Sequence, residues 1–206
     1  MPIKAMIWDL GGVILRTEDP LPRQQLADQL GMARDDLEEL VFHSPSGISA
    51  QLGEISVQEH WNNIRQILGI PAHETPAFQK AFFGGDRIDE SLLADIRRLS
   101  VYYRVGLLSN AFSDLRQFIT HYWKFADVFE DMVISSEVGL MKPDTRIYHL
   151  ALERLEVSPE QAVFIDDYTR NVEGSQAVGM HAIHFRNRAQ AWTELQSLLK
   201  HDNPAL

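Results

Sequence analysis

Short apolar runs recur along the chain, and each run ends in polar residues. The runs are residues 3–8, 101–108, 132–134, 162–165 and 181–185. Near-continuous apolar runs of this length are typical of strands that are buried on both faces, as in a parallel sheet. The pattern therefore predicts five buried strands.

Helical spacing of apolar residues separates the later runs. The predicted helices cover residues 92–99, 147–155, 168–178 and 188–200, and Gly179 follows the third of them as a helix-ending glycine. Strands that alternate with helices are joined by right-handed crossovers and form an open sheet. The predicted fold is an α/β fold with a doubly wound parallel sheet.

Residues 17–87 interrupt this alternation. They carry helical patterns at 21–31, 34–43, 56–68 and 74–83, with loops at 43–47, 69–71 and 84–85. Such a stretch is too long for a loop inside a compact domain. We therefore predict an all-helical cap domain at 17–87, inserted into a core domain formed by 1–16 and 88–206, with the cap acting as a lid over the sheet edge.

Composition narrows the classes of function. The 206 residues are 45% hydrophobic and 23% charged, as in an ordinary globular protein. The net charge of −10 repels phosphate backbones, and no Lys/Arg cluster offsets it, so we expect no nucleic-acid partner. Cysteine is absent, which excludes disulfides, thiolate metal sites and thiol catalysis.

No apolar run approaches the roughly 20 residues that cross a membrane. The start MPIKAMIWDL lacks the hydrophobic region of a signal peptide. We therefore expect a cytoplasmic protein with no membrane partner, present as a monomer or homodimer.

Polar side chains follow the predicted strands. They are Asp9, Ser109, Asn110, Asp166 and Asp167, and Lys142 follows the third run after a short loop. The carboxyl ends of parallel strands meet at one edge, where ligands bind in this fold. Three carboxylates in close quarters need a compensating charge, and Mg²⁺ prefers such oxygen ligands. A carboxylate can also attack phosphorus, while Ser109, Lys142 and backbone N–H groups bind the phosphoryl oxygens.

Four motifs in order resemble those of the haloacid dehalogenase-like hydrolases with a helical cap, the C1 phosphatase subgroup. They are WDLGGVI (8–14), LLSNA (107–111), GLMKPD (139–144) and FIDDYTRNVEGSQAVGM (164–180), and the stretch LGEIS (52–56) is similar to the cap of that subgroup.

The resemblance implies Asp9 as nucleophile, and Ser109 and Asn110 as phosphate ligands. It implies Lys142 as the ammonium that bridges nucleophile and phosphate. The resemblance also implies a Mg²⁺ site. Its ligands would be Asp9, Asp166, the neighbouring Asp167 and the carbonyl of Gly11. Asn171 stands where many relatives carry a further acid.

Position 11 departs from the family pattern. Phosphatases of this superfamily usually place a second aspartate there, as the acid that protonates the leaving group, and this chain has Gly11. Haloacid dehalogenases also lack that aspartate and need no metal, but their Tyr-Gly-Thr is here Gly11-Gly12-Val13. The expected activity is Mg²⁺-dependent hydrolysis of small phosphate monoesters such as sugar phosphates, through an aspartyl phosphate. The alternatives are a metal-independent 2-haloacid dehalogenase, or a binding or regulatory protein that kept the fold and lost turnover.

Overall fold

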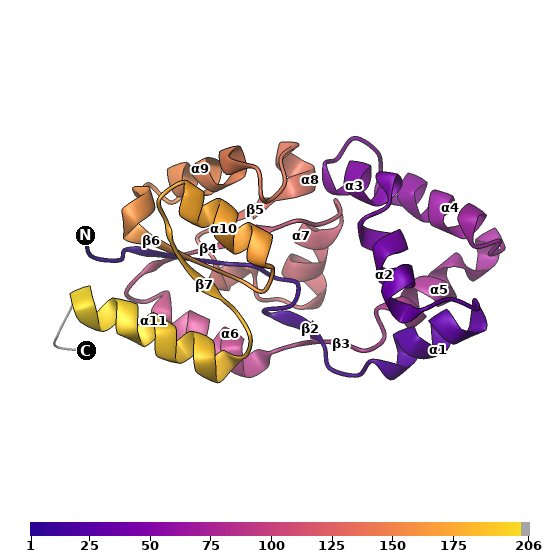
Figure 1. The fold of residues 1–206 in the computed structure, drawn as a ribbon, viewed down its shortest axis with the longest axis horizontal. Coiled ribbons are helices and arrows are strands. Elements are labelled where there is room, and N and C mark those ends of the chain that lie inside the picture. The colour runs from indigo at the N-terminus through magenta and orange to yellow at the C-terminus, as the bar shows by residue number, and fades with distance from the viewer. Residues whose placement is uncertain (203–206) are drawn as a thin grey trace.

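A five-stranded parallel sheet forms the centre of the computed structural model (Figure 1). Its order is β5-β4-β1-β6-β7, with β1 Ala5–Trp8, β4 Arg104–Ser109, β5 Asp131–Ile134, β6 Ala162–Asp166 and β7 His181–His184. The structure describes residues 1–202, so 203–206 of the predicted core domain lie outside the described residues. The predicted α/β class and parallel sheet are confirmed.

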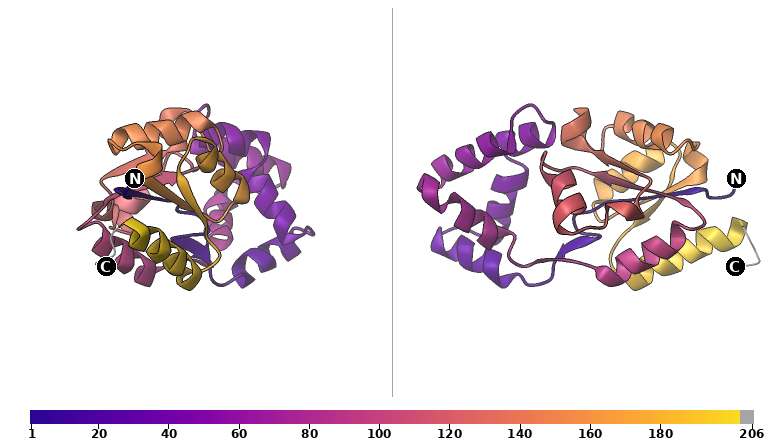
Figure 2. Two further views of the ribbon diagram at one scale, coloured as in Figure 1. Left: turned by 60° about the vertical axis from the view of Figure 1, so that its left-hand side comes forward. Right: turned by 180° about the vertical axis from the view of Figure 1, so that it is seen from behind.

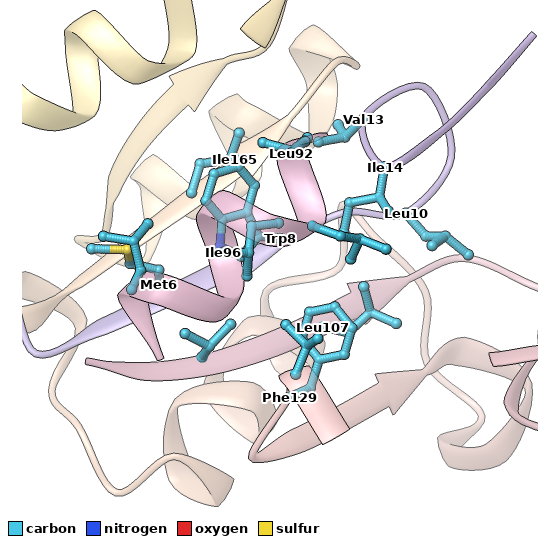
Figure 3. Packing of buried hydrophobic residues seen from close by; sticks show 14 of the residues in the cluster. Met6, Trp8, Leu10, Val13, Ile14, Leu92, Ile96, Leu107, Phe129 and Ile165 are labelled. Carbon is cyan, nitrogen blue, oxygen red and sulfur yellow. The ribbon is translucent and has the colours of Figure 1, made fainter. Parts of the chain in front are cut away.

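Both faces of the sheet are buried along β1, β4, β5 and β6, as the apolar runs predict. The edge strand β7 differs from the prediction, because only Ile183 in it is buried. In β1, Met6 and Trp8 point into one hydrophobic cluster and Ala5 and Ile7 into the other, because side chains alternate along a strand. Figure 3 shows the first cluster, in which Trp8 lies among Leu107, Ile165 and Ile96.

Two helices cover each face. Helices α6 (Glu90–Leu99) and α11 (Arg188–Asp202) pack on the face with Met6 and Trp8, and α9 (Thr145–Arg154) and α10 (Thr169–Ala177) lie on the other side (Figure 1). Asp89 and Asp144 cap α6 and α9, because each side chain accepts a backbone N–H of the first turn.

The insertion forms a separate body beside the carboxyl edge of the sheet (Figure 2). Its helices are α1 Leu21–Gln29, α2 Arg34–Phe42, α3 Pro45–Gln51, α4 Val57–Ile67, the 3₁₀ turn η1 Ala72–Glu74 and α5 Thr75–Phe82. They bury their own apolar cluster, with Ile64 and Phe82 at its centre. Ser56 and Glu59 form a capping box that starts α4.

Two details of the insertion differ from the predicted pattern. Its ends form a two-stranded antiparallel ribbon, β2 (Leu15–Thr17) with β3 (Asp86–Ile88), rather than helix or loop. The predicted loop at 43–47 instead starts α3, because Ser44 caps that helix and Pro45 occupies its first position. The ribbon carries both chain crossings between core and cap.

The chain between β4 and α9 is built of short elements. They are α7 Leu115–Gln117, the π-helical turn η2 Phe118–Tyr122, the 3₁₀ turn η3 Ala126–Val128, and α8 Ser135–Val138 after β5; a further 3₁₀ turn, η4 Pro159–Gln161, precedes β6. Residues 101–103, predicted as strand, form an exposed turn before β4. Among the described helices, none is both long and apolar enough to cross a bilayer.

Candidate active site

Asp9 directly follows β1, the central strand of the sheet. Its backbone N–H donates to the carbonyl of Ile165 at 2.9 Å, so the chain stays paired with β6 up to the carboxylate. Asp166 ends that neighbouring strand. The two aspartates therefore lie at the carboxyl ends of adjacent strands, as the sequence predicts.

The ammonium of Lys142 lies between these two carboxylates. Its Nζ is 2.8 Å from Oδ1 of Asp9 and 2.6 Å from Oδ2 of Asp166. All three side chains are buried, and Asp166 is completely so. Ion pairs buried to this degree are sensitive to loss of one partner, which leaves an uncompensated charge.

Three further hydrogen bonds, from two donor groups, fix the carboxylate of Asp166. The Nδ2 of Asn171 lies 3.1 and 3.0 Å from its two oxygens, and the backbone N–H of Tyr168 donates to Oδ1 at 2.7 Å. The phenol of Tyr148 in turn donates to the backbone carbonyl of Asn171 at 2.8 Å. Asp166 is thus held rigidly by the start of α10.

The loop after β4 is tied to the loop that carries Lys142. The side chain of Asn110 accepts the backbone N–H of Lys142 at 2.8 Å and donates to its carbonyl at 2.9 Å. The backbone N–H of Ala111 donates to the hydroxyl of Ser135 at 2.9 Å. Ser109, the buried last residue of β4, therefore directly precedes a loop that is fixed to the Lys142 loop.

Asp9, Asp166 and Asp167 form a cluster of three carboxylates. One oxygen from each lies within 4.8 Å of the others. The pKa of Asp9 is raised to about 8: burial is the largest cause, the Lys142 ammonium opposes the rise, and the carboxylates of Asp166 and Asp167 add to it. Burial alone would lower the pKa of Lys142, but the attraction of Asp9 and Asp166 holds it above its ordinary value. Carboxylates in this arrangement fit a divalent cation, which would stabilise their ionised forms.

Two glycines follow Asp9 in the loop that leads to β2. Gly12 has a φ of +76°, and a Cβ there would lie 2.0 Å from Oδ2 of Asp167. Gly11 is exposed, its φ is not positive, and a Cβ there would have no atom within 4 Å. Close approach of the backbone to Asp167 therefore requires glycine at position 12 and not at position 11.

The structure thus brings together most of the residues that the sequence singles out. Asp9, Lys142 and Asp166 are in direct contact, and Asp167 is adjacent. The predicted functional roles of all these residues, of Ser109 and Asn110, and of the Gly11 carbonyl stay predictions.

Two residues that support the site, Tyr148 and Asn171, have no role in the prediction from sequence. Tyr148 has no sequence signal, since its position in α9 reads as apolar core. Asn171 has one: it lies five residues after Asp166, in the first turn of α10.

Comparison with known proteins agrees with this architecture. A sesquiterpene phosphatase, astK of Aspergillus oryzae, is 27% identical over 202 residues, which cover 95% of this chain and 96% of that protein. A D-ribitol-5-phosphate phosphatase of Bacteroides thetaiotaomicron is 26% identical over 207 residues, covering 96% and 98%.

A crystal structure of a HAD family enzyme from Bacteroides thetaiotaomicron, in complex with magnesium and inorganic phosphate, matches with a TM-score of 0.77 at 24% identity. It covers 94% of this chain and 98% of that one. The model of the haloacid dehalogenase-like hydrolase family matches residues 3–179. The chain belongs to the haloacid dehalogenase-like hydrolases.

Proposed function

We propose that the protein is a Mg²⁺-dependent phosphatase of small phosphate monoesters that acts through an aspartyl phosphate. The observation that carries this proposal is the buried ammonium of Lys142 between Asp9 and Asp166, with Asp167 beside them. The phosphatase names of two full-length relatives and the magnesium and phosphate in the similar crystal structure support it. A cytoplasmic location, a monomeric or homodimeric state, and the division into a cap at 17–87 and a core at 1–16 and 88–206 stay predictions.

In the proposed reaction, an oxygen of Asp9 attacks phosphorus and the bond from phosphorus to the ester oxygen breaks. The ester oxygen leaves as an alkoxide and takes a proton from solvent water, since position 11 offers no acid. A second water then hydrolyses the aspartyl phosphate to restore Asp9 and release phosphate. The ammonium of Lys142 orients the nucleophile and offsets charge on the transferring group. The hydroxyl of Ser109 would donate to a phosphoryl oxygen, while Asn110 holds the backbone of Lys142 in place.

The residues that would hold Mg²⁺ are Asp9, Asp166, Asp167 and the carbonyl of Gly11. The carboxylate cluster fits this ion because Mg²⁺ takes hard oxygen ligands, one or two carboxylates together with waters and phosphate oxygens. The bound ion would offset the negative charges of nucleophile and phosphate. Asn171 would position Asp166 rather than bind the ion, because its amide nitrogen faces both carboxylate oxygens.

A panel of phosphate esters and 2-haloacids, assayed with Mg²⁺ or with EDTA, tests the proposal. We expect phosphate release that needs the metal. Asp9→Asn should lower kcat by on the order of 10³ or more, because an amide is a poor nucleophile. Asp19→Asn, in the exposed loop before α1, is the matched control and should keep full activity.

Hydroxylamine trapping provides a second readout, since it captures an acyl phosphate on the wild type and should capture none on Asp9→Asn. Halide release without metal would instead establish the dehalogenase, and the absence of both products would favour a binding protein.

A further inference from the structure

An aromatic surface lies where the cap meets the core. Phe42 at the end of α2 stacks on Phe112 of the core, with ring centroids 6.2 Å apart and planes 16° apart. Phe83, which follows α5, lies 6.4 Å from Phe42. We call Phe42, Phe83 and Phe112 the aromatic wall. In Figure 1, α2 faces α7 across the boundary between cap and core.

The aromatic wall is continuous with the loop that follows β4. Phe112 is three residues beyond Ser109, so their Cα atoms lie within about 10 Å of each other. Asn110 and Ala111 between them are held by Lys142 and Ser135. A phosphate bound at Ser109 would therefore place its ester group within reach of Phe112.

The exposed part of the aromatic wall is apolar. Phe83 is 37% exposed and Phe42 is half-buried, whereas Phe112 is buried. Trp61 and His60 lie behind Phe112, with ring centroids 6.3 and 4.9 Å away.

Polar side chains near the aromatic wall bind one another or the backbone. Gln51 donates to the carbonyls of Phe42 and Gly47, and Ser46 pairs with the ring of His60 at 3.0 Å. Apart from Nε2 of His60, which is buried and has no hydrogen-bond partner, these groups are already satisfied, so the wall offers a polyol few hydrogen bonds and favours a hydrocarbon.

We propose that the aromatic wall binds the organic part of the substrate, and that the preferred substrates are phosphate monoesters of apolar alcohols. This proposal rests on the proposed phosphatase activity and names its substrate class. Aromatic side chains offer a large apolar contact area, so each methylene that leaves water against them strengthens binding. The polyol phosphates would bind through their phosphate alone.

The test is a series of n-alkyl phosphates from propyl to octyl, with ribitol 5-phosphate as the polar comparison. Chain length hardly changes the acidity of the alcohol, so the series isolates binding from leaving-group chemistry. We expect kcat/KM to rise by up to about fourfold for each buried methylene, and at least about tenfold over the series. Octyl phosphate should also exceed ribitol 5-phosphate.

A pair of variants locates the effect. Phe83→Ser should lower the ratio of kcat/KM for octyl over propyl phosphate by at least about fivefold, since that ring is the most exposed part of the wall. Tyr102→Ser is the matched control: Tyr102 is 80% exposed in the turn before β4, at the opposite end of that strand from Ser109. It should leave the ratio unchanged. Thermal melts check that both variants fold.

The outcomes separate the two proposals. Suppose that hydrolysis needs the metal but kcat/KM does not change with chain length, or that ribitol 5-phosphate is preferred. Either result agrees with the proposed phosphatase activity but overturns the proposed substrate class. A folded Phe83→Ser variant with the wild-type ratio also overturns it. If no ester releases phosphate, the proposed phosphatase activity itself is overturned. The wild-type series decides the substrate class even if the variant fails to fold.

Discussion

The neighbouring positions 11 and 12 both carry glycine, but only position 12 excludes a side chain. At Gly12 the positive φ and the carboxylate of Asp167 exclude a side chain, whereas at Gly11 the backbone is ordinary and the space is open. A positive φ therefore does not account for the glycine at position 11. An aspartate is sterically allowed at the position where related phosphatases usually carry their acid.

Gly11→Asp should consequently fold and supply a proton donor for the leaving group. In the wild type, the rate of phosphoryl transfer should depend steeply on the acidity of the leaving alcohol, so aryl phosphates should react faster than alkyl phosphates. The variant should flatten that dependence and speed alkyl phosphates by ~10²-fold, the lower end of the contribution of general acids. Rates across esters of graded alcohol pKa measure the slope, with phosphoryl transfer shown to limit the rate.

Gly12→Ala is the control for this experiment. Its Cβ would overlap the carboxylate of Asp167, so the melting temperature and the activity should both fall. An unchanged slope in a fully folded Gly11→Asp protein would mean that another group already acts as the acid.

At the scale of an element, α4 buries a histidine in the core of the cap. His60 is fully buried, and its Nδ1 pairs with the hydroxyl of Ser46 at 3.0 Å. Burial lowers the pKa of His60, which a contact with the carbonyl of Val41 partly offsets. The folded protein therefore keeps this ring neutral at pH values where the unfolded chain has taken up a proton.

The consequence is a pH-dependent stability. Because the unfolded state binds more protons, the free energy of unfolding should fall as pH drops from about 6.5 toward the lowered pKa, by at most about 1.4 kcal/mol per pH unit. Above pH 7 this contribution is complete. His60→Phe removes the titrating group and should show a smaller loss than the wild type between pH 7.5 and 5.5.

Urea unfolding at several pH values measures this difference, and the other titrating groups cancel between the two proteins. Parallel curves for wild type and His60→Phe would show that His60 titrates alike in both states.

Elements with a clear apolar pattern were predictable from the sequence, and short elements without one were not. The strand β6 and the helix α4 carry enough apolar periodicity to show their type. The strands β2 and β3 have three residues each, half-buried or exposed, so their pairing depends on contacts between distant segments. The start of α3 cannot be told from a loop by sequence, because Ser44 and Pro45 occur both in turns and at helix starts.

The active-site residues were predictable for a related reason. Polar residues at the ends of buried strands must lie at one edge of a parallel sheet, which locates Asp9 and Asp166 without any knowledge of side-chain packing. The position of Lys142 between them depends on a loop, and loop geometry does not follow from periodicity. The donors around Asp166 are likewise set by the tertiary packing of α10.

At the scale of the whole molecule, the cap contacts the core at the ribbon, around Phe112, and also at Gly53. Gly53, in the turn between α3 and α4, has a φ of +71°, and a Cβ there would lie 2.2 Å from the carbonyl oxygen of Ser136 in α8. The backbones of cap and core therefore approach each other closely at this point, and the approach requires glycine.

Gly53→Ala should disturb the contact between the cap and the core. The left-handed conformation costs an alanine about 1–2 kcal/mol, and the clash with Ser136 adds to that. We expect a lower melting temperature and an altered KM. Gly31→Ala is the matched control within the cap, since Gly31 has a φ of +68° and a Cβ there meets nothing within 4 Å. Equal losses of stability in the two variants, with unchanged kinetics, would contradict a cap–core contact at Gly53.

The order of the strands also governs when the protein can fold. Trp8 in the central strand pairs with Leu107 on one side and with Ile165 on the other, so both partners emerge late from the ribosome. At common synthesis rates, on the order of 10–30 s separate Trp8 from Ile165. The cap can collapse on its own cluster in that interval, while the first strand stays unpaired with its apolar side chains in water. A chaperone that shields nascent chains would therefore act on the strand that ends up most deeply buried.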